Sequence, residues 1–104
     1  MKPYDVCISD EALKDLEQIY EYIADTLQSP ANAIGQYQRI AEAILRLDIM
    51  PERFQVMDWG IESIQELRRM PVDHYSVFYI IQENQVIITN VIYSASDLDQ
   101  RFRE

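Results

Sequence analysis

Along the first part of the chain, apolar and polar positions alternate first at strand spacing and then at helical spacing. Residues 4–9, YDVCIS, alternate in type, which predicts a short strand with one buried face. Ser9 is a favourable helix N-cap, and two acidic residues follow it where the helix dipole favours negative charge. From there apolar residues recur three and four positions apart, which predicts a helix of about five turns with one buried stripe: Leu13, Leu16, Tyr20, Ile23 and Leu27.

The acidic side chains of this first helix fall between its apolar positions. We interpret them as the solvated face of a surface helix rather than as a catalytic or metal-binding cluster. They are Asp15, Glu17, Glu21 and Asp25.

A second helix is predicted to begin at Ser29 and Pro30, because serine is a favourable N-cap and proline is tolerated at the first helical position. Pro51 marks its expected end. Since only a short link separates the two helices, we expect them to form an antiparallel hairpin. The apolar stripe of the second helix again has spacings of three and four: Ala33, Tyr37, Ile40, Ile44 and Leu47.

The second half of the chain changes to strand-like patterns. A loop with Gly60 as its hinge leads into a weakly alternating strand, residues 63–70, which Pro71 and Asp73 are expected to end. Residues 75–82 are nearly all β-branched or aromatic, which predicts a strand covered on both faces.

A tight turn at Glu83 and Asn84 is predicted to lead into a partner strand at residues 85–93. The polar residues 94–104 could form a short terminal helix with Phe102 packed back. The predicted order is β-α-α-β-β-β, an α+β fold in which a helical hairpin packs on a mainly antiparallel sheet. We expect residues 1–104 to form a single domain.

The net charge of the chain disfavours some classes of binding partner. The chain carries 18 Asp and Glu against 9 Lys and Arg, for a net charge of −9. Proteins that bind nucleic acid through its phosphates usually have a basic surface, because counterion release drives that binding. Extensive nucleic-acid binding is therefore disfavoured, although a local basic patch can act over a Debye length of about 8 to 10 Å.

Residue counts and apolar runs exclude several other classes. The single Cys7 cannot form an internal disulfide, and we expect it to be a small core residue. Two glycines are too few for a phosphate-binding loop, and one histidine with one cysteine cannot form a zinc cluster. No apolar run approaches the roughly 18 residues that span a bilayer, and the start lacks the apolar core of a signal peptide. We therefore expect a cytoplasmic protein with no cofactor, metal or membrane association.

The stretch ELRRMPVDHYSVFYII, residues 66–81, gathers two arginines and the only histidine of this acidic chain. On a strand, Arg68 and Arg69 point to opposite faces, so at most one of them serves a given surface. Each could form an ion pair with Glu66 or another carboxylate, or bind a phosphate or carboxylate of a target.

His74 and the tyrosines around it also have two readings. His74 could act as a general acid or base, or be exposed in a turn. Tyr75, Tyr79 and Tyr93 are interpreted as core or interface aromatics rather than proton donors. A Ser-His-Asp site built on His74 lacks a nucleophile elbow to support it.

Five segments in a fixed order are similar to a known family. They are ISDEALKDLEQIYEYIA, SPANAIGQY, RLDIMPERF, ELRRMPVDHYSVFYII and VIITNVIYSASDLDQRF. Their order and spacing, over nearly all residues from Tyr4 to Phe102, resemble the RelE/ParE superfamily of toxins from bacterial type II toxin–antitoxin systems. The family fold, a helical hairpin on a curved antiparallel sheet, agrees with the elements predicted from periodicity.

For a RelE-like member, the resemblance implies cleavage of messenger RNA on the ribosome by a cluster of cations with a tyrosine or histidine. The candidate catalytic residues here are Arg68, Arg69, His74 and Tyr75. Without its charge-stabilising groups, RNA cleavage by that mechanism would be very slow. At the family's other cationic positions, and at its terminal tyrosine position, this chain has Ile64, Glu66, Ser76, Ser96 and Phe102.

The long hairpin, the LRR…DHY-VF stretch and the SDL near the end are more similar to ParE-like members, which inhibit DNA gyrase by binding. We therefore interpret the chain as a ParE-like toxin with Arg68 and Arg69 as target contacts. The basic C-terminal motif of that branch is diluted, with Ser94 and Ser96 in place of cations. The alternatives are a RelE-like mRNA endoribonuclease and a detoxified member that keeps only antitoxin binding.

The resemblance also implies a cognate antitoxin whose C-terminal segment wraps the toxin, and hence a toxin–antitoxin hetero-oligomer. Most toxins of the family are basic and their antitoxins acidic. At a net charge of −9, this chain cannot rely on attraction to an acidic partner. Burial of apolar surface should then dominate the complex, and its affinity should depend only weakly on salt.

Overall fold

The elements follow one another in the predicted order. The structure is a computed structural model that describes residues 2–57 and 66–94. Two main helices and four strands are joined by short helical turns: β1 (Asp5–Ile8), α1 (Asp10–Glu21), the π-helical η1 (Tyr22–Thr26), α2 (Pro30–Leu45), the 3₁₀ turns η2 (Arg46–Asp48) and η3 (Pro51–Arg53), β2 (Arg68–Val72), β3 (Tyr75–Gln82) and β4 (Gln85–Tyr93).

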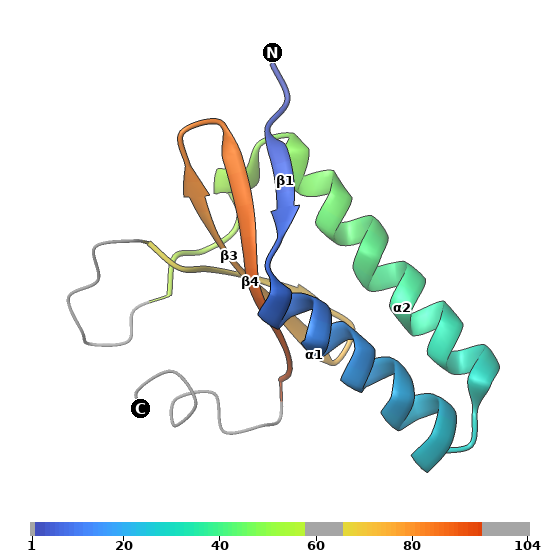
Figure 1. Cartoon of the computed structure of the whole chain (residues 1–104). Coiled ribbons are helices and arrows are strands. Elements are labelled where there is room, and N and C mark those ends of the chain that lie inside the picture. The colour runs from blue at the N-terminus through green and yellow to red at the C-terminus, as the bar shows by residue number, and fades with distance from the viewer. Residues whose placement is uncertain (1, 58–65, 95–104) are drawn as a thin grey trace.

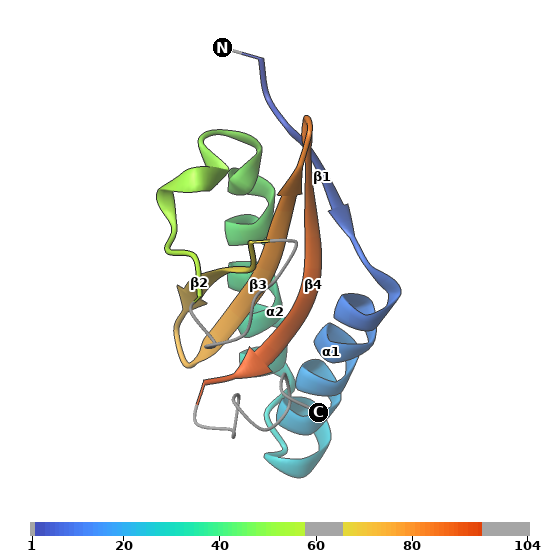
Figure 2. The same cartoon turned by 90° about the vertical axis from the view of Figure 1, so that its left-hand side faces the viewer.

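The four strands form one sheet in the order β1-β4-β3-β2. β1 runs parallel to β4, whereas β2–β3 and β3–β4 are antiparallel hairpins. The two helices run antiparallel along one face of the sheet, and the tip of their hairpin extends beyond it (Figures 1 and 2). The predicted α+β fold, with its helical hairpin and mainly antiparallel sheet, is confirmed.

The core lies between the hairpin and the facing side of β2, β3 and β4. β3 is buried along residues 75–79, as the run of β-branched and aromatic residues predicts. Ser9 caps α1, because its Oγ accepts a hydrogen bond from the Ala12 N–H at 3.1 Å. The same hydroxyl donates to the Thr89 carbonyl at 3.2 Å, which ties the start of α1 to β4. The buried core cluster comprises Ala12, Leu16, Ile40, Ile44, Leu47, Met70, Tyr75, Val77, Tyr79, Val86, Ile88 and Val91.

The buried face of α1 and η1 matches the predicted stripe only at Leu16 and Ile23. Leu13, Tyr20 and Leu27 are 43%, 37% and 56% exposed. The helix instead turns its small Ala12 toward the sheet, where the absence of a larger side chain lets α1 approach β4 closely. Tyr20 packs edge-to-face on Tyr37, with 6.4 Å between ring centroids, so part of the predicted stripe holds the hairpin together from outside. In α1 and η1 the partly or fully buried positions are Ala12, Asp15, Leu16, Ile19, Ile23 and Ala24.

Asp15 corrects the prediction of a wholly solvated acidic face. Its side chain is buried, and its carboxylate accepts a hydrogen bond from the Val91 N–H at 2.9 Å and one from Asn90 Nδ2 at 3.5 Å. β4 is irregular nearby, where the register with β3 shifts after Phe78. A carboxylate on α1 thus satisfies backbone and side-chain donors of β4. Glu17, Glu21 and Asp25 are exposed as predicted.

The helix ends differ in detail from the prediction. Pro30 is the first residue of α2, but Ser29 makes no side-chain cap; its carbonyl accepts from the Ala33 N–H instead. α2 ends at Leu45, well before Pro51, which begins η3. Cys7 is exposed rather than in the core, because the outward face of the edge strand β1 carries it.

β2 begins at Arg68 and contains Pro71 instead of stopping there. A proline fits because β2 is an edge strand, where its missing N–H costs no ladder hydrogen bond. In the following hairpin the positive φ of 55° falls on Glu83 rather than on Asn84. The expected hinge at Gly60, residues 63–65 of the expected strand, and the terminal segment with Phe102 lie outside the described residues.

In the described ranges, no helix has the length and apolarity needed to cross a membrane.

Candidate protein-binding groove

Arg68 holds the segment that follows α2 against the sheet. Its Nη1 donates to the carbonyls of Glu52 at 3.0 Å and Phe54 at 2.7 Å, and its Nη2 lies 3.6 Å from the Glu66 carboxylate. Only 17% of the Arg68 side chain is exposed, so most of its hydrogen-bonding capacity is used inside the protein. The ion pair with Glu66 that the sequence offered as one reading is present.

Arg69 lies on the opposite face of the sheet, as strand alternation predicts. The next residue, Met70, belongs to the core cluster under the helices, so Arg69 points away from them. Its Nε donates to Ser76 Oγ at 2.8 Å, and Ser76 Oγ shares a second 2.8 Å hydrogen bond with Ser94 Oγ. Ser76 is fully buried and serves as the side-chain partner of Arg69.

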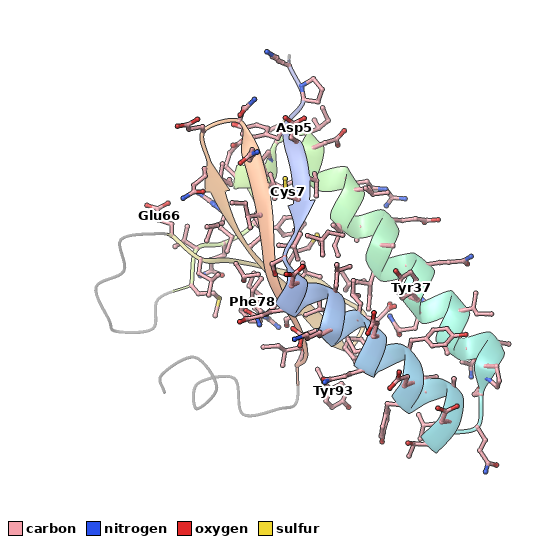
Figure 3. All side chains as sticks on the ribbon, in the orientation of Figure 1. Asp5, Cys7, Tyr37, Glu66, Phe78 and Tyr93 are labelled. Carbon is pink, nitrogen blue, oxygen red and sulfur yellow. The ribbon has the colours of Figure 1, made fainter. Side chains whose placement is uncertain are left out.

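His74 and Tyr75 lie at the far end of β2 from Arg68. Arg68 pairs with Tyr79 and Val72 with Tyr75, so four strand steps, or about 13 Å, separate these ends. In Figure 3, Glu66 lies on one side of the molecule and Tyr93 lies near the helical hairpin.

The four candidate catalytic residues therefore do not meet at one point. Arg68 packs against residues 52–54, Arg69 occupies the other face, and His74 and Tyr75 line a groove next to the hairpin. Burial, with smaller contributions from Tyr93 and Tyr22, raises the pKa of Tyr75, so its phenol stays protonated at neutral pH. It can donate a hydrogen bond or pack against a partner, but it is not a base there.

The groove at His74 and Tyr75 is formed where the hairpin extends past the sheet. We call it the hairpin groove; its volume is about 850 Å³. α1 and η1 form one wall, α2 the other, and the ends of β3 and β4 the floor. It is lined by Asp15, Gln18, Ile19, Tyr22, Ile23, Leu27, Ala31, Asn32, Gly35, Gln36, Arg39, His74, Tyr75, Val91, Ile92 and Tyr93.

A polar network closes one end of the hairpin groove. Asp73, in the turn between β2 and β3, accepts from Arg39 Nε at 2.8 Å and from Gln36 Nε2 at 3.0 Å. The Arg39 and Gln36 hydrogen bonds hold the pKa of the Asp73 carboxyl below its usual value. The turn thereby stays attached to α2, and His74 keeps its place on the rim.

The rest of the groove is rich in apolar side chains that remain uncovered. Tyr22, Leu27 and Tyr93 are 53%, 56% and 48% exposed, and all three line it. Tyr93 also packs against Tyr75, with 5.6 Å between ring centroids. Contiguous exposed apolar surface with a polar rim is typical of a protein-binding site. No cluster of three or more potential metal ligands occurs in the ranges that the structure covers.

Sequence reasoning singled out His74 and Tyr75 but not the residues opposite them. Asp15 was predicted to lie on a solvated helix face, and Gln36 was not singled out. The folded chain buries both and brings them to the groove. The available signal was weak: each lies three residues from a buried apolar residue of its own helix, Ala12 and Ala33.

Residues 6–98 match the family model described as the ParE toxin of the type II toxin–antitoxin system parDE. This chain belongs to the ParE toxin family. Its membership in the RelE/ParE superfamily, predicted from five sequence segments, is confirmed. No curated protein sequence matches the chain.

Solved structures share this ParE-family fold at low sequence identity. A chain from the chromosomal ParDE system of P. aeruginosa superposes with a TM-score of 0.71 at 17% identity, over 86% of this chain and 95% of that one. A chain from the archaeal RelE–RelB complex of Pyrococcus horikoshii OT3 gives a TM-score of 0.60 at 20% identity, over 89% and 97%. Both neighbours come from toxin–antitoxin systems.

Proposed function

We propose that this ParE-family toxin is neutralised by a cognate antitoxin, and that an amphipathic segment of the antitoxin fills the hairpin groove. The observation that carries the proposal is the uncovered apolar surface of a groove large enough for a peptide segment. An amphipathic helix lays its apolar face into a groove of this kind. The structural neighbours come from ParDE and RelE–RelB systems, which supports the same kind of partner.

A pair of matched variants tests the groove. Leu27 and Leu45 are 56% and 63% exposed, but only Leu27 lines the hairpin groove. With the cognate antitoxin, Leu27→Glu should weaken binding at least about tenfold, because a carboxylate would be buried without a partner. Leu45→Glu should leave the Kd within about threefold. If titration calorimetry shows that the two variants change the antitoxin Kd equally, the hairpin groove is not part of the interface.

We further propose that the toxin acts by binding a target protein such as DNA gyrase, rather than by cutting messenger RNA. The separation of Arg68, Arg69 and His74 supports a binding mechanism, because a charge-stabilised cleavage site needs its groups around one reacting phosphate.

Expression of the toxin alone in bacteria separates the targets. Inhibition of gyrase should produce filaments and the DNA-damage response, whereas rapid loss of translation with cleaved messages would identify a ribonuclease. Normal growth at good expression would mean a detoxified member that retains only antitoxin binding. Toxin localisation to the cytoplasm, where each of these targets lies, is part of the proposal.

Of the two proposed target contacts, Arg69 can be tested more directly than Arg68. It lies on the face away from the helices and is tied only through Nε to Ser76 in the described part of the chain. Arg69→Ala should abolish growth arrest while circular dichroism stays unchanged. Arg68→Ala is harder to interpret, because it also removes the hydrogen bonds from Arg68 to the carbonyls of Glu52 and Phe54. A loss of toxicity could then come from a change in the protein's own structure. Full toxicity of Arg69→Ala would place the target contact elsewhere.

A further inference from the structure

A second groove lies further along the same face of α2, toward its C-terminal end, and has a different chemistry. We call it the arginine groove; its volume is about 320 Å³, and α2, η3 and β2 form it. Three arginines and one carboxylate line it, in a chain whose net charge is −9. Its apolar surface includes Phe54, Met70 and Val72.

The three arginines are regularly spaced. Arg39 and Arg46 are seven residues apart, which is about two helical turns or 10 Å along α2 and its 3₁₀ extension. Arg53 follows after seven more residues, in η3. It is held in place, because its Nη1 donates to the carbonyls of Ile49 and Met50 and its guanidinium stacks over the Phe54 ring at 4.8 Å.

Two of these charges remain available to a partner. Arg46 is 74% exposed at its side chain, and its ion pair with Glu42 is long, at 3.9 Å. The hydrogen bonds of Arg53 go to carbonyl oxygens, so no carboxylate in the described ranges neutralises it. Arg39 is already paired with Asp73 at 2.8 Å and contributes less free charge.

The edge of β2 beside the groove cannot accept a full added strand. The Arg69 N–H points away from β3 and donates to the Gln55 carbonyl, so alternate residues of β2 present their backbone groups outward. The next such residue is Pro71, which has no N–H. A partner in the arginine groove is therefore recognised through side chains rather than by extension of the sheet.

We propose that the arginine groove is a second docking surface, which binds an acidic peptide segment of a partner protein. The segment would carry carboxylates about 10 Å apart to meet Arg46 and its neighbours, with an apolar side chain between them for the partly exposed Phe54 and Val72. The apolar surface and the overall negative charge favour a peptide over a nucleic acid. This groove adjoins the hairpin groove proposed for the antitoxin, and Arg39 lines both.

The test uses a defined peptide, so it does not depend on the antitoxin. The probe has glutamates three positions apart with leucines between them, about 10 Å in an extended chain. It should bind the whole protein in low salt, and its glutamine counterpart should bind at least about tenfold more weakly. Arg46→Glu with Arg53→Glu should reduce binding of the acidic peptide at least about tenfold.

A matched variant distinguishes the effect of charge in the groove on peptide binding from the effect of net charge. Lys2→Glu with Lys14→Glu changes the net charge equally, at two exposed lysines outside the groove, and should leave the Kd within about threefold. If Arg46→Glu with Arg53→Glu does not fold by circular dichroism, Arg46→Gln with Arg53→Gln replaces it. Equal losses in the lysine and arginine variants, no binding of the wild type at millimolar peptide, or tighter binding of an oligo-dT strand would each overturn the proposal.

Discussion

Asp15 shows how one buried polar residue joins two elements. Its carboxylate serves the Val91 N–H and the Asn90 amide, far along the chain. Asp15→Ala should lower the free energy of unfolding by about 1 to 3 kcal/mol, because the Val91 donor would stay buried without a partner. Urea denaturation measures this. Glu17→Ala, on the exposed side of α1, should stay within about 0.5 kcal/mol. Similar losses in both would mean that helix propensity, not the buried hydrogen bond, is responsible.

Tyr79 should make the protein sensitive to alkali. It is fully buried and donates to the Pro51 carbonyl at 2.6 Å; burial raises its pKa to about 12, against the opposing charges of Arg68 and Arg53. The unfolded phenol ionises near a pH of about 10. The folded state thus holds the proton more tightly, and this contribution is present below about pH 10 and lost as the pH rises toward about 12.

Urea unfolding at several alkaline pH values checks this. Tyr79→Phe should be less stable at neutral pH by about 1 kcal/mol, from the lost hydrogen bond, but should lose less stability between about pH 10 and 12. Tyr37→Phe, at a 40% exposed position, is the matched control for removing a phenol hydroxyl from the surface. A Tyr79→Phe slope equal to that of the wild type would contradict the assignment.

At the scale of elements, periodicity was enough to predict both helices, the hairpin and the two central strands. For α1 and η1 it was right at Leu16 and Ile23 but wrong at Leu13, Tyr20 and Leu27, which are exposed. These larger apolar residues were chosen in place of a face that contains Ala12 and Asp15. The spacing of apolar residues does not determine which face of α1 packs on the sheet. That choice depends on how closely α1 can approach β4.

The candidate site was less predictable than the fold. Alternation along a strand correctly placed Arg68 and Arg69 on opposite faces, because that is a local property of the backbone. The hairpin groove is not local: it brings residues of α1 and α2 to the ends of β3 and β4. Sequence spacing does not give the distance between residues of different elements. His74, Tyr75 and Tyr93 were singled out in advance, but not as parts of one groove with the helices.

Gly35 offers a test within α2. It lies inside the helix and lines the hairpin groove, and an added Cβ would meet only the end of the Arg39 side chain, at 3.4 Å. Gly35→Ala should raise the free energy of unfolding by about 0.5 to 1 kcal/mol, because alanine loses less backbone entropy in a helix. Gln38→Ala on the exposed side of α2 is the control and should change little. A less stable Gly35→Ala would mean that Arg39 cannot move aside.

At the scale of the whole molecule, the excess of acidic residues sets how stability depends on salt. With 18 acidic and 9 basic residues, carboxylates repel one another over most of the surface. The ion pairs Arg39–Asp73, Arg46–Glu42 and Arg68–Glu66 are few in the described ranges and mostly exposed, so they offset little of this repulsion.

Added salt should therefore stabilise the fold. Raising NaCl from a few millimolar to about 0.3 M shortens the Debye length severalfold and screens this repulsion. If about 1 kcal/mol of repulsion is relieved, the Tm should rise by roughly 4 to 8 °C in calorimetry. Lys2→Glu with Lys14→Glu makes the net charge more negative and should respond more steeply, because these lysines form no ion pair with a described residue. A Tm that falls with salt would mean that attractive pairs outweigh the charge excess.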